Sequence, residues 1–111
     1  MAEARLASGL WVGAYLTRLG LADIPAYVMA RGDDTAGAIA VKCAHLDGRA
    51  TLWRREWDFE TDTRPWVATD TGPEPDIDAA IARACSTDPD LWVIEIESRT
   101  GATLLDQEGL F

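Results

Sequence analysis

The sequence predicts an α+β domain with a mostly antiparallel sheet of five to six strands and two helices, in the order α-β-β-β-β-α-β-β. Apolar residues recur at helical spacing in only two segments, whereas the strand-like runs are short and joined mostly by tight turns. The chain lacks the regular alternation of strands and helices that builds parallel sheets. We therefore expect both helices to cover one side of the sheet.

The first helix is expected over residues 5–19, where one side carries small and apolar residues at three- and four-residue spacing: Leu6, Gly9, Val12, Gly13 and Leu16. A glycine inside a helix lowers its stability by about 1 kcal/mol relative to alanine. The two glycines of this stripe therefore predict a close contact, most simply with the protein's own sheet. Gly20 follows the last apolar residue and is expected to end the helix in the left-handed conformation.

A β-hairpin is the clearest element of the sequence. After a short strand at residues 26–31, two longer strand-like runs at residues 38–46 and 49–57 are separated only by Asp47-Gly48. This dipeptide suits the two positive φ angles of a type I′ turn, so we expect a two-residue loop.

The register of the hairpin follows by counting outward from such a loop, which places Lys42 opposite Trp53. One face then carries residues suited to a core: Ile39, Val41, Cys43 and Leu52. The other face mixes small, charged and aromatic residues: Ala40, Lys42, Ala44, Leu46, Thr51, Trp53, Arg55 and Trp57.

The second half of the chain predicts a further strand, a helix and a final strand pair. A strand is expected at residues 66–69, and a helix begins near Asp76, whose carboxylate suits the positive end of the helix dipole. Residues 91–98 carry the strongest strand signal, and residues 102–105 can pair back with them after a turn.

The composition limits the classes of function. A chain of 111 residues fits one globular domain, 1–111. Its charge of 10 − 19 = −9 weighs against nucleic acid or an anionic membrane as a partner. Cys43 and Cys85 have no cysteine or histidine at the spacing of a zinc or redox motif, so we expect no metal and no cofactor. No apolar stretch suits a membrane span or a secretion signal, so we expect a cytoplasmic protein.

Several segments resemble those of domain-of-unknown-function family 1491, which consists of short alphaproteobacterial proteins: residues 10–16 (LWVGAYL), 31–32, 36–42, 46–50 (LDGRA) and 88–97 (DPDLWVIEIE). The resemblance covers nearly the whole chain and implies a bacterial cytoplasmic protein. It implies no activity, because the family has no established function. Cys85 departs from the family pattern, which has a longer polar side chain there, so no thiol mechanism is expected.

The mixed hairpin face is the leading candidate site, with Trp53, Trp57, Lys42 and Arg55 close together in the expected register. Tryptophan and arginine often anchor protein interfaces, and a cation can stack on an indole ring. This pattern predicts a protein-binding or adaptor protein, or self-association, without catalytic activity. The alternative is that a helix covers this face within the monomer. The apolar tail to Leu110 and Phe111 leaves the same two options open.

A small hydrolase that uses Asp70 or His45 is the alternative from another class. Asp70 opens an Asp-Thr-Gly triplet like that of dimeric aspartic proteases, but Pro73 follows where a small-residue turn is needed. His45 is the only histidine, but no serine or cysteine is placed by sequence as its nucleophile. Turn and capping roles explain the acidic clusters of the chain. The sequence therefore favours binding over catalysis.

Overall fold

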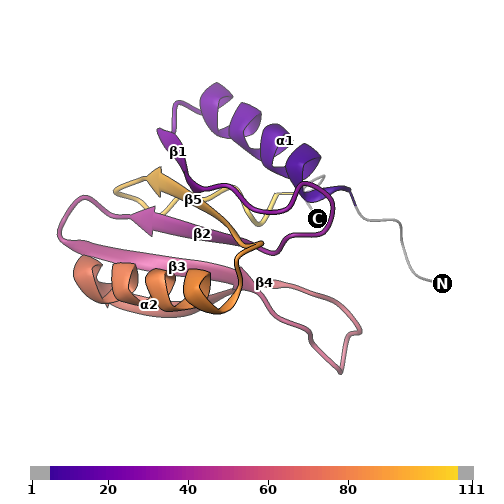
Figure 1. Cartoon of the computed structure of the whole chain (residues 1–111). Coiled ribbons are helices and arrows are strands. Elements are labelled where there is room, and N and C mark those ends of the chain that lie inside the picture. The colour runs from indigo at the N-terminus through magenta and orange to yellow at the C-terminus, as the bar shows by residue number, and fades with distance from the viewer. Residues whose placement is uncertain (1–5, 108–111) are drawn as a thin grey trace.

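The computed structural model describes residues 6–107, which form two helices and one five-stranded sheet (Figure 1). The elements are α1 (Ser8–Leu21), β1 (Ala26–Ala30), β2 (Ile39–Ala44), β3 (Arg49–Arg55), β4 (Trp66–Pro73), α2 (Glu74–Thr87) and β5 (Trp92–Glu97). The α+β class is confirmed, and five strands agree with the lower predicted count. The order ends after β5, because residues 102–105 form no strand.

The sheet has the strand order β1-β5-β2-β3-β4. All neighbouring strands are antiparallel except β2 and β5, which are parallel. β5 therefore lies between two strands that precede it in the sequence. The tight turns of the sequence predict the antiparallel pairs, but they hold no information on this insertion.

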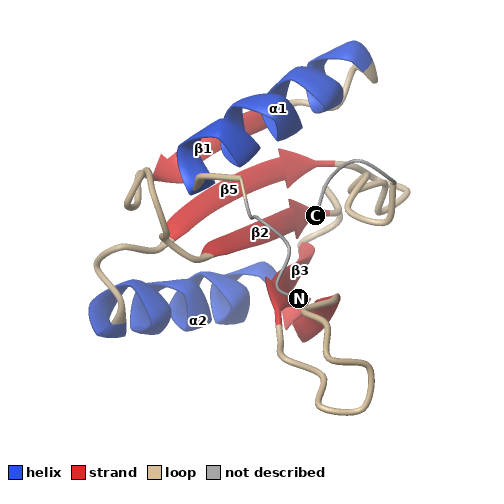
Figure 2. Ribbon diagram, turned by 90° about the vertical axis from the view of Figure 1, so that its right-hand side faces the viewer, coloured by secondary structure: helices blue, strands red, loops and turns tan. Residues whose placement is uncertain are grey.

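The two helices cover opposite faces of the sheet, so the prediction of one covered side is wrong (Figures 1 and 2). α1 packs with Val41 and Ile94, whereas α2 packs with their neighbours Ala40 and Val93. Successive strand residues point to opposite faces. Because most residues of the central strands β2 and β5 are buried on whichever face they lie, both faces need a helix to exclude water.

The β2–β3 hairpin differs from the prediction by one residue. The amide of His45 donates to the Arg49 carbonyl oxygen at 3.0 Å, so the loop holds three residues, 46–48. Two of them have positive φ, 62° at Leu46 and 89° at Gly48. Lys42 therefore pairs with Leu52, and Trp53 pairs with Val41. When β2 is taken as the reference, every side chain of β3 points to the opposite face of the sheet from the predicted one.

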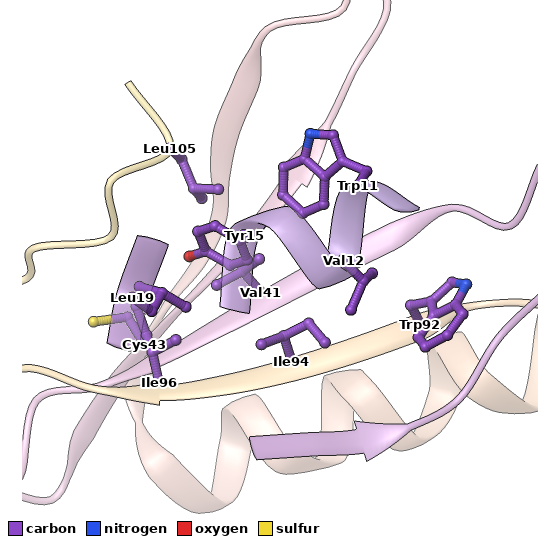
Figure 3. Close-up of a cluster of buried hydrophobic side chains, with 10 residues drawn as sticks. All are labelled: Trp11, Val12, Tyr15, Leu19, Val41, Cys43, Trp92, Ile94, Ile96 and Leu105. Carbon is purple, nitrogen blue, oxygen red and sulfur yellow. The ribbon is translucent and has the colours of Figure 1, made fainter. Parts of the chain in front are cut away.

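The larger core lies between α1 and the sheet (Figure 3), and ten buried residues form it: Trp11, Val12, Tyr15, Leu19, Val41, Cys43, Trp92, Ile94, Ile96 and Leu105. Tyr15 donates its hydroxyl to the Thr103 carbonyl oxygen at 2.8 Å. Burial, with a smaller contribution from Cys43, raises the pKa of Tyr15. This hydrogen bond and the burial of Leu105 attach the segment after β5 to the core. The segment does not form the predicted strand.

The glycine stripe of α1 makes a close contact at one of its two glycines. A Cβ atom on Gly9 would lie 2.8 Å from Oδ1 of Asp34, whereas one on Gly13 would meet open space. The amide of Gly9 donates to the Asp34 carbonyl oxygen at 2.8 Å, and the Ser8 hydroxyl donates to the Gly37 carbonyl oxygen at 2.6 Å. The loop after β1 therefore holds the start of α1. Gly20 lies inside the helix, and Asp23 has the left-handed conformation instead, with φ 59°.

Two further glycines lie at the contact between this loop and the start of β5. A Cβ atom on Gly32 or Gly37 would overlap the carbonyl oxygen of Asp90. The amide of Asp33 donates to that same oxygen at 3.0 Å, and the Trp92 indole donates to the Asp33 carbonyl oxygen at 2.8 Å. Backbone therefore meets backbone here, with no room for a side chain.

We expect Gly37→Ala to lower the free energy of unfolding by about 3 kcal/mol, because the new methyl group meets rigid backbone. Gly13→Ala is the matched control. It should raise stability by about 0.5–1 kcal/mol, because alanine favours an exposed helix position. Urea unfolding of both variants checks this, and equal effects would contradict the described contact.

Candidate functional site

A cluster of aromatic rings and one arginine lies where α1 meets β3 and β4. The Trp11 and Trp66 rings are 5.5 Å apart between centroids, and Trp11 also contacts Tyr15 at 4.9 Å. Cζ of Arg55 lies 4.9 Å from the Trp66 ring centroid and 5.9 Å from that of Trp11. Guanidinium groups at such distances are attracted to the ring faces. We name these three side chains, Trp11, Trp66 and Arg55, the tryptophan–arginine cluster.

The elements explain why these side chains meet. Arg55 and Trp66 are cross-strand partners in β3 and β4, so their side chains project from the same face. Trp53, two residues before Arg55, shares that face and packs against the core under α1. The sequence prediction found Trp53 and Arg55 but missed Trp11 and Trp66, because their approach depends on how α1 lies over the sheet.

Both indole N–H groups of the cluster are buried, and neither has a hydrogen-bond acceptor among the described residues. A buried polar group without a partner costs free energy. The cluster is therefore held by ring packing and by Arg55 above both rings.

A hydrogen-bonded hairpin tip, residues 56–65, extends from the end of β3 and β4 away from the sheet (Figures 1 and 2). The amide of Glu56 donates to the Pro65 carbonyl oxygen at 3.1 Å, and that of Asp58 donates to the Thr63 carbonyl oxygen at 2.8 Å. Oδ1 of Asp58 accepts the amide of Glu60 at 2.9 Å. Residues 56–65 are thus a structured continuation of the hairpin.

The hairpin tip carries two exposed aromatic side chains. Phe59 is 89% exposed and Trp57 is 46% exposed, and their rings meet edge to face at 6.3 Å. Four carboxylates lie within the same seven residues: Glu56, Asp58, Glu60 and Asp62. The result is an apolar pair on a projecting element, flanked in sequence by four carboxylates and by Arg64.

Lys42 lies on the other face of the sheet, so the prediction that it shares a face with Trp53 and Arg55 is wrong. Its side chain is 5% exposed, and Nζ lies within 3.0 Å of three carboxylates, those of Glu74, Asp78 and Glu95. Burial alone lowers the pKa of a lysine, but the hydrogen bonds to the three carboxylates outweigh it and raise the pKa of Lys42. Lys42 thus joins the start of α2 to β5.

The two residues of the hydrolase alternative lie apart. Asp70 pairs with Leu52 on the α2 side, where it lines a shallow groove of about 370 Å³ with Arg54 and Arg83. His45 lies on the α1 side, where its Nε2 is 2.9 Å from the buried Thr51 hydroxyl oxygen. The sheet separates them, so a hydrolase mechanism would have to use one of the two without the other.

Residues 6–107 form neither a metal-binding cluster nor a membrane-spanning helix. No group of three or more histidine, cysteine, aspartate or glutamate side chains there is placed to hold a metal ion. No helix in this part of the chain has the length and apolar character needed to cross a membrane. The predicted tail residues Leu110 and Phe111 lie outside the described residues.

Fold and site together define a small α+β domain with a helix on each face of its sheet and a projecting aromatic hairpin. The chain belongs to the family described as "Protein of unknown function (DUF1491)", whose sequence model matches residues 6–106. The resemblance of the sequence segments to this family is thus confirmed. Among proteins of curated function, no match is found.

Solved structures of relatives have the same fold. The crystal structure of a DUF1491 family protein from Caulobacter crescentus CB15 superposes with a TM-score of 0.84 at 36% identity, covering 92% of this chain and 96% of that one. An NMR structure of a family protein from the same bacterium gives 0.80 at 36% identity, covering 94% and 96%. The solution structure of protein Atu0922 from A. tumefaciens gives 0.71 at 30% identity, covering 86% and 87%.

We expect Lys42→Met to lower the free energy of unfolding by about 1–3 kcal/mol, because three carboxylates then face one another without their cation, while water still screens the partly exposed Glu74 and Asp78. Arg49→Met, at an exposed position of the adjacent strand, is the control and should change stability by no more than about 0.5 kcal/mol. Urea unfolding near pH 7 gives both values. A small loss at Lys42 would show that α2 is held by its apolar contacts alone.

We expect stability to decline at alkaline pH. The pKa of each of three groups, Cys43, Tyr15 and Lys42, lies above its ordinary value of 9.0, 10.0 or 10.5 in the folded state. The folded chain therefore holds these protons more tightly than the unfolded chain, and the stabilisation is complete below pH 9.0. It is lost progressively as the pH rises toward the folded pKa values. Unfolding titrations from pH 7 upward check this, and Tyr15→Phe should lessen the decline.

Proposed function

We propose that this protein is a non-catalytic binding protein that docks to a partner protein through the hairpin tip, with Trp57 and Phe59 as the anchor residues. The observation that carries the proposal is the exposed aromatic pair on a hydrogen-bonded hairpin. Large aromatic side chains supply much of the binding energy of protein interfaces. Phe59 is 89% exposed in the monomer, so its burial by a partner lowers the free energy of the complex.

The order of the hairpin tip supports this role. Its cross-strand hydrogen bonds and the Asp58 side chain already fix the backbone that presents the two rings. Binding then orders few additional residues, so less of the contact energy is lost to entropy. Covering both rings removes roughly 200 Å² of apolar surface or more, which contributes about 5 kcal/mol at 25 cal/mol per Å².

The tryptophan–arginine cluster lies where the hairpin tip joins the sheet, and it holds the tip in position. Arg55 and Trp66 are the last and first residues of the two strands that enter it, and both pack against Trp11 of α1. In this proposal Arg55 and Trp53 position the docking element rather than contact the partner. Lys42, which lies on the other face, takes no part.

The charges of the hairpin tip define the chemistry of the partner. Four carboxylates flank the aromatic pair in sequence, and the whole chain carries a charge of −9. A partner of like charge would be repelled, so the proposal specifies an apolar pocket with a rim of lysine or arginine side chains. Opposite charge on the rim accelerates the encounter, and this effect weakens as salt is added.

We also propose that the protein works in the cytoplasm. Both cysteines, Cys43 and Cys85, are free thiols rather than a disulfide. Reducing compartments keep thiols in this state, whereas exported domains of this size often rely on disulfides.

The test uses the full chain with the photoreactive residue p-benzoylphenylalanine at position 59, cross-linked in cells of its own host. A partner captured there is then purified, and its affinity is measured for the wild-type chain and for the variant Trp57→Ala with Phe59→Ala. We expect binding to weaken at least 100-fold, because two anchors of about 2 kcal/mol or more are lost. We also expect wild-type binding to weaken as salt is added.

Leu46→Ala is the matched control, because Leu46 has the same exposed fraction as Trp57, 46%, and lies in the other hairpin loop. It should leave the affinity unchanged. The stability of all variants should stay within about 0.5 kcal/mol of wild type, since no buried group changes. Equal affinity of the double variant and the wild-type chain would rule out the hairpin tip as the docking element.

A further inference from the structure

We infer that β1 is a self-association edge through which two copies of this chain pair antiparallel about a twofold axis. β1 lies at one end of the sheet and pairs only with β5. Its three central side chains, Tyr27, Val28 and Met29, are between 45% and 60% exposed. An apolar edge strand with open backbone groups is a template for pairing with another strand.

The backbone of β1 shows which groups are open. The Glu97 amide donates to the Pro25 carbonyl oxygen at 3.0 Å, so Pro25 faces β5. In an antiparallel pair the backbone groups of successive residues point alternately toward and away from the neighbour. The amide and carbonyl groups of Ala26 and Val28 therefore point to the outer edge, before the bulge between Val28 and Ala30.

Two such edges are complementary to each other. A twofold axis through Tyr27 places Ala26 of one copy opposite Val28 of the other, so their open amides and carbonyls satisfy one another on both sides of the axis. The two Tyr27 residues then stand opposite each other at the axis, and each keeps its hydroxyl donating to Oε1 of Glu97 in its own chain at 3.4 Å.

The charges favour a second copy as the occupant. Like charge opposes the approach of two chains of −9 at most surfaces, but residues 24–30 carry no charge. In the twofold arrangement Asp23, before β1, comes to the end of the partner strand that is followed by Arg31, whose exposed guanidinium also pairs with Asp34 of its own chain at 3.3 Å. The other edge strand, β4, carries the exposed Asp70 and ends in Pro73. A charge and a proline on an edge strand both disfavour pairing with another chain.

The pairing is expected to be weak. A five-residue edge with its flanking side chains buries less surface than a stable dimer interface needs. A dissociation constant on the order of 100 μM is consistent with an interface of this size. The inference is independent of the proposed function, because β1 and the hairpin tip extend from opposite ends of the sheet.

The test is sedimentation equilibrium of the full chain from about 10 μM to 1 mM, a range that spans the expected dissociation constant. We expect a monomer–dimer equilibrium in the wild-type chain. Val28→Pro should weaken it at least tenfold, because proline removes only the outward amide of Val28 and leaves the pairing with β5. A wild-type chain that stays monomeric throughout the range overturns the inference.

Val28→Lys is the second variant, which keeps the test valid if the proline variant fails to fold. Its two lysines, one from each copy, lie beside the axis and repel each other. It should also weaken the dimer at least tenfold. Ala68→Lys, at an exposed position of the other edge strand, is the matched control and should leave the equilibrium unchanged. The inference is overturned if Val28→Lys dimerises like the wild-type chain, or if Ala68→Lys weakens the dimer equally. Intact amide NMR spectra establish that each variant is folded.

Discussion

Strand β5 is the constraint on which the rest of the structure depends. It lies between β1 and β2, and its residues are buried on both faces, with Ile94 and Ile96 under α1 and Val93 toward α2. A strand with apolar residues on both sides needs a helix over each face to keep water away from them. Just before β5, the carbonyl oxygen of Asp90 accepts a hydrogen bond from the loop that contacts the start of α1. Sheet order, both helix positions and that loop therefore depend on one strand.

The two faces of this sheet are built from different interactions. The α1 face is an apolar core that continues into the tryptophan–arginine cluster. The α2 face has smaller side chains, and Lys42 supplies there a charged contact between α2 and the sheet. The aromatic hairpin continues β3 and β4, and the tryptophan–arginine cluster connects its base to α1.

The sequence predicts those features that local chemistry decides. Helical spacing locates both helices, and β-branched runs locate β2, β3 and β5. The helix faces are not predicted, because they depend on the insertion of β5 between two distant segments. The final predicted strand fails for a related reason: both edges of β5 are already paired, with β1 and with β2, and residues 103–105 pack on the core instead. Of the candidate site, Trp53, Arg55 and Trp57 follow from the sequence pattern, whereas Trp11 and Trp66 follow only from the packing of α1.

The three-residue loop between β2 and β3 has a consequence for how this family can vary. Side chains alternate between faces, so deleting one loop residue would turn Trp53 toward α2 and Leu52 toward α1. An insertion of two residues keeps the parity and leaves both layers intact. Length changes at this turn in related chains should therefore come in even steps, and a relative with an odd change should show exchanged large and small residues along β3.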